Sequence, residues 1–307
     1  MDRRKDVSRF FRKVRKWLKE RASAPHFKEF YEESKEGLLL YAEQKSSRLN
    51  ILDIETVYFQ HLVHFEQAVL NEASEGHVDL ALAVRYAEAH IHFEAAFAEA
   101  NRGGPVLKNQ AALYFSVAVI ADWKETAHRI GQALVRGLDT PLLDLRHTDR
   151  HRAGEVYRHF WFIMHLYAKA GGREFDTALY SYPPDMSPYE NVLDDWLTTD
   201  LTKVQDWVCA MADYHVQEAR NTAHAIVDEF DAEDVMLFPY EILCWLRLRE
   251  WAGRENPDSF DHPLMQQPLA QLPTPSPLEV PATPLLDQVV DRFRQEFPDS
   301  FPGWLTP

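Results

Sequence analysis

Glycine is scarce in this chain, with only 11 residues among 307. Loops that cradle phosphate groups and β folds dense in turns both need residues that adopt positive φ at little cost, so this scarcity disfavours both. Cysteine is scarcer still, because Cys209 and Cys244 are the only two, each within an apolar run of helical character. We expect two buried thiols there rather than a disulfide or a redox pair.

The sequence also lacks the common signatures of enzymes. It contains no Gly-x-Ser-x-Gly elbow, Walker A loop, His-Glu-x-x-His motif or Cys-x-x-Cys pair. The charged N-terminus is not followed by the apolar segment of a secretion signal. In the apolar middle of the chain, the longest stretch free of Asp, Glu, Lys and Arg covers residues 109–121, too short to span a bilayer. These absences predict a cytoplasmic protein that is not an enzyme and needs no cofactor.

Charge is unevenly distributed along the chain. There are 33 Lys and Arg against 48 Asp and Glu, a net charge of −15. Residues 1–21 hold ten basic and three acidic side chains, a local charge of +7, so the other 286 residues carry −22. Binding to nucleic acid requires a basic face that neutralises phosphates, and the acidic body argues against it. A basic protein is the natural partner for such a body.

Apolar residues recur at spacings of three and four over most of the chain, which is typical of amphipathic helices. We predict an all-α fold of ten or more helices, arranged as stacked antiparallel helical hairpins in one large domain. The helix over residues 156–170 is apolar around most of its circumference and is expected at the centre of the core. The expected helices cover residues 26–48, 52–73, 78–100, 111–120, 127–138, 156–170, 189–198, 200–230, 233–252 and 284–297.

Three segments of the chain differ in character. Residues 1–22 are predicted to form a basic amphipathic helix and residues 23–260 a helical body, with two halves, 23–104 and 105–260, as an alternative division. Ten of the 18 prolines lie from Pro263 onward. Residues 261–307 are therefore predicted to be a proline-rich tail that wraps the surface and contains one short helix.

The basic amphipathic helix has two interpretations. Its apolar stripe can pack on the rest of the domain, or it can lie on an anionic membrane and make the protein a membrane-surface adaptor. Packing on the domain is favoured, because the acidic body that follows attracts a basic helix; membrane contact through residues 1–21 is the less favoured alternative. The stripe consists of Phe10, Phe11, Val14, Trp17 and Leu18.

Two histidine clusters keep a helical enzyme open as an alternative function. The side chains of His61, His64, His90 and His92, with nearby glutamates, can in principle hold a metal. A di-iron bundle, however, needs a Glu-x-x-His motif on each of two helices, and only one such motif, Glu125 to His128, is present. We therefore expect these histidines to be structural, with no metal site.

A second cluster has the Arg-x4-His spacing of helical HEPN-type ribonucleases, in which His acts as acid or base and Arg stabilises phosphoryl charge. It consists of Arg146, Arg150 and His151. Its position between expected helices, in an acidic chain that repels RNA, argues against that activity.

The strongest candidate for an interaction surface lies in residues 173–261, where 20 acidic and six basic side chains give a net charge of −14. The helix beginning near Asp200 is expected to bury Leu201, Val204, Val208 and Met211, which leaves Asp206 and Asp213 on a common exposed face. Carboxylates beside aromatic anchors suit a basic partner such as a nuclease, whereas a solvated helix face is the alternative. The candidate partner-binding residues are Asp194, Asp195, Trp196, Asp200, Asp206, Trp207, Asp213 and Tyr214.

Residues 238–247 read FPYEILCWLR, residues 261–265 read DHPLM, and a proline-rich tail follows. Together with the alanine-rich helix pair over 111–138, this region resembles the C-terminal part of bacterial polymorphic-toxin immunity proteins. The chain is similar to the all-helical immunity-protein-49 group over about residues 105–300, and next to the PoNe-nuclease immunity proteins. The basic N-terminal helix has no counterpart in this resemblance.

The resemblance implies a cytoplasmic antitoxin that binds one cognate toxin or effector, delivered by contact-dependent or type VI secretion, and blocks its active site. The acidic residues would then steer the partner, and the aromatic residues would anchor it. Within the matched region, Pro239 and Glu241 are expected to set a helix start, and His262 and Pro263 to fix a turn. The resemblance thus implies a toxin-neutralising immunity protein.

Overall fold

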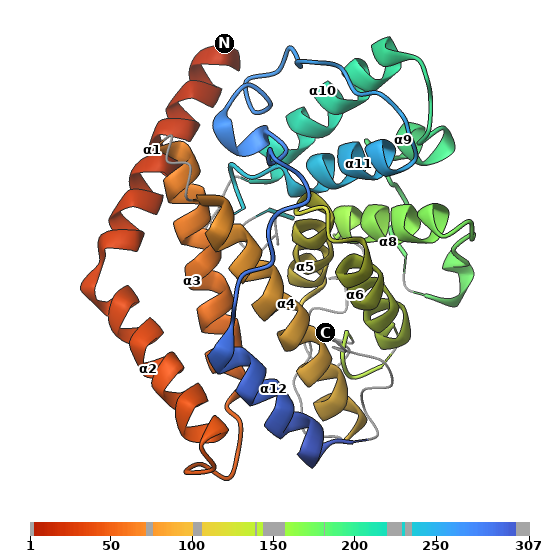
Figure 1. Cartoon of the computed structure of the whole chain (residues 1–307). Helices are drawn as coiled ribbons and strands as arrows, with labels where there is room; N and C mark the ends of the chain where they lie inside the picture. Colours follow the sequence, from red (N-terminus) through yellow and green to blue (C-terminus); the bar gives the residue numbers. More distant parts are fainter. Residues whose placement is uncertain are drawn as a thin grey trace.

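The computed structural model describes residues 3–71, 76–100, 106–138, 140–143, 157–180, 182–219, 229–230 and 235–298. Every regular element within these ranges is a helix, so the predicted all-α fold is confirmed for them (Figure 1). They contain eleven α-helices and two short 3₁₀ helices, which agrees with the prediction of ten or more.

In chain order the helices are α1 (Arg3–Ser23), α2 (Pro25–Ala42), α3 (Ile51–Leu70), α4 (Gly76–Glu99), α5 (Lys108–Ile120), α6 (Lys124–Gly137), α8 (Arg158–Ala170), η1 (Thr177–Leu179), α9 (Glu190–Asp194), α10 (Leu201–Glu218), α11 (Tyr240–Trp251), η2 (Pro268–Ala270) and α12 (Pro284–Glu296).

Local chemistry sets several helix starts. Pro25 and Pro284 stand at the first positions of α2 and α12, where a missing backbone N–H costs nothing and the fixed φ suits a helix. The Asp200 carboxylate accepts hydrogen bonds from the backbone N–H groups of Thr202 (2.9 Å) and Lys203 (3.3 Å), so it caps α10. Asp122 turns the chain from α5 into α6 with a φ of 63°, a conformation that aspartate tolerates better than most residues.

The core is centred on α5 and α8. Helix α5 packs against α4, α6, α8 and α11, and one continuous cluster of buried apolar side chains draws on every described α-helix. On α8 the side chains of Phe160, Trp161, Ile163 and Met164 are all buried, so the central position predicted for this helix is confirmed. These contacts do not establish the predicted regular stacking of antiparallel hairpins, which stays a prediction.

Helix α1 packs along α3 and touches α2, with Val14 and Leu18 buried and Phe10, Phe11 and Trp17 partly buried (Figure 1). Its apolar stripe is therefore used by the body, as the favoured interpretation predicts. The outer face of the helix exposes a row of cations, Arg9, Arg12, Lys13, Arg15, Lys16 and Lys19. Within the described ranges, no helix is both long enough and apolar enough to cross a bilayer.

Four helices are shorter than the sequence predicts. Helix α2 ends at Ala42 although the predicted helix covers 26–48, and α9 ends at Asp194 although the predicted helix covers 189–198. Helix α10 ends at Glu218 although the predicted helix covers 200–230. Helix α11 begins at Tyr240 although the predicted helix covers 233–252. Residues 235–238, just before α11, are buried although they form a turn. Apolar periodicity reports burial, and this buried turn therefore lengthens the helix predicted over 233–252.

Two side chains are more exposed than predicted. Leu201 is 39% exposed rather than buried, because residues 200–203 are all exposed and the first turn of α10 projects beyond the body. Cys209 is partly exposed on the same helix, whereas Cys244 on α11 is buried; both are free thiols.

The C-terminal segment runs from the end of α11 back to the N-terminal helices and ends in α12, which packs against α2 and α4 (Figure 1). On the way Trp123 Nε1 donates to the Leu278 carbonyl oxygen at 2.8 Å, and Leu278 N donates to the Ala121 carbonyl at 3.0 Å. Arg85 on α4 donates to the Asp287 carboxylate on α12 at 3.0 Å. These contacts tie the segment to α4 and to the turn between α5 and α6.

Candidate functional site

The predicted carboxylates gather on the surface formed by α9, the turn after it and α10. Residues 174–219 contain ten Asp or Glu and one Lys, Lys203, and no Arg. The segment after α11 adds another carboxylate, that of Asp261, and Gln205 on α10 holds this segment. In the amide orientation that satisfies both its nitrogen and its oxygen, Gln205 donates to Ser259 O (3.0 Å) and accepts from Asp261 N (2.7 Å). We call this exposed set the acidic surface: Asp194, Asp195, Asp200, Asp206, Asp213 and Asp261.

Some of these carboxylates also serve the fold. Asp195 lies 3.3 Å from Lys203 Nζ, Asp200 caps α10, and Asp213 lies 3.6 Å from His262 Nε2. Asp194 and Asp206 are exposed and make no hydrogen bond or ion pair with any residue in the described ranges. The charge at these two positions can therefore be changed without removing any contact seen in the described ranges.

The predicted aromatic anchors are half-buried and pack against the core. The Trp207 ring lies 6.2 Å from that of Trp245, and the Trp196 carbonyl accepts from Trp245 Nε1 at 3.0 Å. The Tyr214 hydroxyl donates to the Glu229 carboxylate at 2.6 Å, and burial together with that carboxylate raises the pKa of Tyr214. The accessible part of the site therefore consists mainly of carboxylates, and the three aromatic rings are only partly exposed.

A buried polar network, absent from the sequence prediction, lies beneath the acidic surface. The Glu229 carboxylate, 2% exposed, accepts from the first backbone N–H groups of α8, Arg158 N at 2.9 Å and His159 N at 3.0 Å, and from His159 Nδ1 at 2.7 Å and the Tyr214 hydroxyl. A carboxylate at a helix N-terminus is also stabilised by the helix dipole. Glu229 thereby fastens α8 to α10.

A second buried pair joins α10 to α11. His215 Nδ1 lies 2.9 Å from the Glu241 carboxylate, and both side chains are wholly buried. The Phe230 ring stacks on His215, with centroids 4.1 Å apart, and lies 4.7 Å from the His159 ring. Glu241 is in the first turn of α11, as the resemblance implies, but it faces the core.

The guanidinium of Arg249, on α11, holds the turn of the acidic surface in place. It donates to the carbonyl oxygens of Trp196 (3.2 Å), Thr198 (3.0 Å) and Glu255 (2.8 Å) and to Asn256 Oδ1 (2.9 Å). The side chain is wholly buried, and burial, with Arg254 nearby, lowers its pKa. His262 fixes the expected turn, since its Nδ1 accepts from Leu264 N at 3.1 Å.

The histidines of the metal hypothesis have other partners. His61 Nδ1 lies 2.7 Å from Asp79, His64 Nε2 lies 2.8 Å from the Gln60 amide, and His90 Nδ1 lies 2.8 Å from the Tyr114 hydroxyl. No group of three or more His, Cys, Asp or Glu side chains able to hold a metal is found in the part of the chain that the structure describes. The HEPN-like residues Arg146, Arg150 and His151 lie outside that part.

Two of these histidines give a prediction about pH. Burial lowers the pKa of His90 to about 3, and burial with Arg129 and Arg136 lowers that of His92 to about 3, whereas the ordinary value is 6.5. Between these values the unfolded chain binds protons that the folded chain does not, so stability is lost as the pH falls from about 6.5 towards 3. The expected slope is up to about 1.4 kcal/mol per pH unit for each histidine.

Urea denaturation at pH 7, 6 and 5 measures this slope. The His90→Asn variant keeps an acceptor for Tyr114 but does not titrate, so its unfolding free energy should fall less steeply with pH than that of the wild type. Equal slopes for the two proteins would show that His90 does not contribute.

Comparison of this chain with protein-family models, with curated proteins and with solved structures gives no match.

Proposed function

We propose that this chain is an immunity protein, which binds a basic toxin or effector in the cytoplasm and neutralises it by covering the active site. The observation that carries the proposal is the acidic surface, whose six carboxylates are all exposed and of which Asp195 pairs with Lys203. Nucleases and other cationic toxins present basic active-site clefts, and an opposed acidic surface is electrostatically complementary to them.

The network beneath the surface supports this function. Arg249 and the Glu229 and Glu241 networks hold α8, α10, α11 and the turn between α9 and α10 in one geometry. Little conformational entropy is therefore lost when a partner binds. The carboxylates then accelerate association, and the edges of Trp207 and Tyr214 add apolar contact. The proposed activity involves no catalytic step, cofactor or nucleic acid.

The test uses the product of a reading frame next to this gene, selected by toxicity that this chain relieves on co-expression. The variant Asp194→Lys/Asp206→Lys changes two exposed carboxylates that have no structural partner among the described residues, and it leaves the Asp200 cap intact. Its association rate with the toxin at low salt should be about tenfold lower than that of the wild type, with a smaller change in dissociation. Raising the salt should reduce the difference, because the charges are screened.

The matched control is Glu29→Lys/Glu36→Lys, which makes the same change in net charge at exposed positions on α2. It should bind and protect nearly as well as the wild type. If the acidic-surface variant folds normally and associates at the control's rate, the acidic surface is a solvated face and the proposal is wrong.

A further inference from the structure

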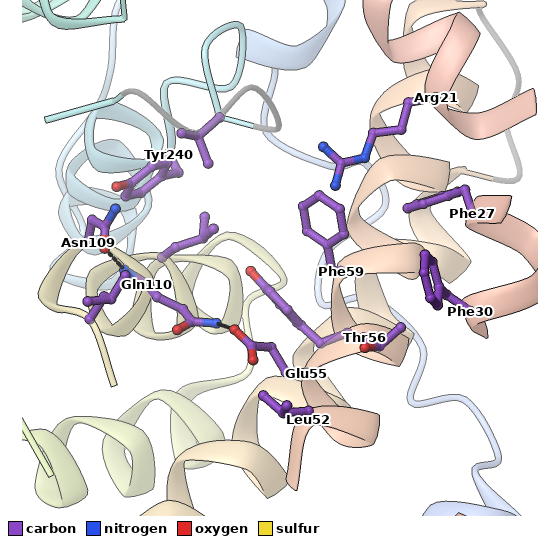
Figure 2. A pocket seen from close by; sticks show the side chains of 14 residues that line it. Arg21, Phe27, Phe30, Leu52, Glu55, Thr56, Phe59, Asn109, Gln110 and Tyr240 are labelled. Carbon is purple, nitrogen blue, oxygen red and sulfur yellow. Dashed lines mark hydrogen bonds between the residues drawn. The ribbon is translucent and has the colours of Figure 1, made fainter. Parts of the chain in front are cut away.

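A pocket of about 540 Å³ lies between α3 and α5 and is bordered by α1, α2 and the start of α11 (Figure 2). The amino-acid sequence alone does not predict this pocket, because its walls come from five helices. Its volume is within the range of sites that enclose small organic molecules. It is separate from the acidic surface, since neither α9 nor α10 contributes to its lining.

The walls of the pocket are mainly aromatic and aliphatic. Phe27 and Phe30 of α2 and Phe59 of α3 form one side, and Leu52 and Leu107 also line the pocket. Phe30 and Leu52 are 59% and 60% exposed, which places them among the most exposed large apolar side chains in the described ranges. Apolar side chains that remain exposed around a concave site favour a ligand with an apolar body.

One end of the pocket carries an oriented carboxylate. The Gln110 amide nitrogen donates to Glu55 Oε1 at 2.7 Å (Figure 2). The same nitrogen donates to the Tyr114 hydroxyl at 2.8 Å, and that hydroxyl lies 2.8 Å from His90 Nδ1. Because burial keeps His90 neutral, its Nδ1 can accept the Tyr114 proton, and both protons of the Gln110 amide nitrogen are then used.

This series of hydrogen bonds determines which polar atoms of Glu55 and Gln110 remain for a ligand. The second Glu55 oxygen and the Gln110 carbonyl oxygen make no hydrogen bond to the described residues, and neither atom is buried without a partner. Both are acceptors and one is charged, so this end of the pocket suits a cationic donor.

The opposite side of the pocket is already occupied by a cation of the protein. The Arg21 guanidinium lies 4.3 Å from the centroid of the Phe59 ring and 4.8 Å from that of Trp17. A ligand cation would be repelled by Arg21 and attracted by Glu55, so the two charges set the orientation in which a cationic ligand binds.

We propose that this pocket binds a small aromatic amine, with its ring between the phenylalanines and its ammonium group on Glu55 and Gln110. The site goes beyond the proposed toxin binding and does not depend on it. The alternative ligand, an aromatic carboxylate paired with Arg21, is an outcome of the test below.

The experiment titrates the full chain with 2-phenylethylamine and with 3-phenylpropionate, which has a similar body and the opposite charge, and follows ligand binding by saturation-transfer NMR. We expect the amine to bind at least about tenfold more tightly than the carboxylate, since a charge-assisted hydrogen bond distinguishes them. Saturable binding of neither probe, equal affinity for both, or tighter binding of the carboxylate would overturn the proposal.

Two variants localise the binding. Glu55→Gln should weaken amine binding about tenfold and remove the preference, whereas Glu36→Gln, an exposed glutamate elsewhere on the surface, should have no effect. Thr56→Trp places a large ring inside the pocket and should abolish amine binding. If amine binding persists unchanged in a folded Thr56→Trp or Glu55→Gln protein, the amine binds elsewhere and the proposal is wrong.

Discussion

Replacing Glu229 with alanine is expected to lower the free energy of unfolding by about 3–5 kcal/mol, the range found when one partner of a buried charged network is removed. The Glu229 carboxylate is the common acceptor for the first two N–H groups of α8, for His159 and for the Tyr214 hydroxyl. The alanine variant leaves these donors in a region from which water is largely excluded. Each buried donor without an acceptor costs about 1–3 kcal/mol.

Urea denaturation, followed by circular dichroism, measures this loss. The Glu229→Gln variant keeps one acceptor oxygen but places an amide nitrogen among donors, so its loss should be smaller than that of the alanine variant. The control is Asp206→Ala, which removes an exposed carboxylate and should change stability by less than about 0.5 kcal/mol. A loss below about 1 kcal/mol for Glu229→Ala would contradict the anchoring role that we assign to this carboxylate.

The second large effect is expected for Arg249→Met, with a loss of about 3 kcal/mol or more. Methionine keeps the length of the apolar stem but removes the donors to three carbonyl oxygens and to Asn256, and unsatisfied buried acceptors are costly. Arg249→Lys should recover only part of the loss, because an ammonium group cannot reproduce the spread of the guanidinium fork.

Hydrogen exchange provides a readout that is specific to this position. In Arg249→Met the amides of residues 195–200 should exchange faster, because Trp196 and Thr198 are held by the guanidinium. The exposed neighbour Arg254, replaced in the same way, serves as the control and should leave both exchange and stability nearly unchanged. Unchanged exchange in a destabilised Arg249→Met protein would mean that the turn is held by other contacts.

Much of the fold follows from the sequence alone. The helices over 52–73, 78–100 and 284–297 are predicted within a few residues of α3, α4 and α12, because each has a continuous apolar stripe. One error occurs where tertiary contacts bury residues outside a helix, in the turn before α11, whereas residues 43–48 after α2 are mostly exposed. Periodicity describes the environment of a side chain, and a buried turn has the environment of a helix face.

The candidate site is predictable in part, and for a related reason. The exposure of Asp206 and Asp213 follows from their offset from Val204, Val208 and Met211 on one helix. The roles of Glu229, Glu241 and Arg249 do not follow from the sequence, because charged residues are usually exposed and their burial depends on partners distant in the chain. In the described part of residues 173–261, the buried carboxylates of Glu229 and Glu241 are matched in charge by the buried Arg247 and Arg249, so their burial leaves the net charge of the exposed residues unchanged.

The position of α12 also has a consequence for the order in which the chain is made. Phe293 of α12 stacks on Phe93 of α4, with ring centroids 4.1 Å apart, and both rings are fully buried. Helix α4 ends at Glu99 and α12 begins at Pro284, a difference of 284 − 99 = 185 positions. At about 5–20 residues per second, a ribosome needs about 10–40 s to cover that interval. During this interval, the surface around Phe93 is outside the ribosome but is not yet covered by α12. This is the period in which the nascent chain is most open to aggregation and to chaperone binding.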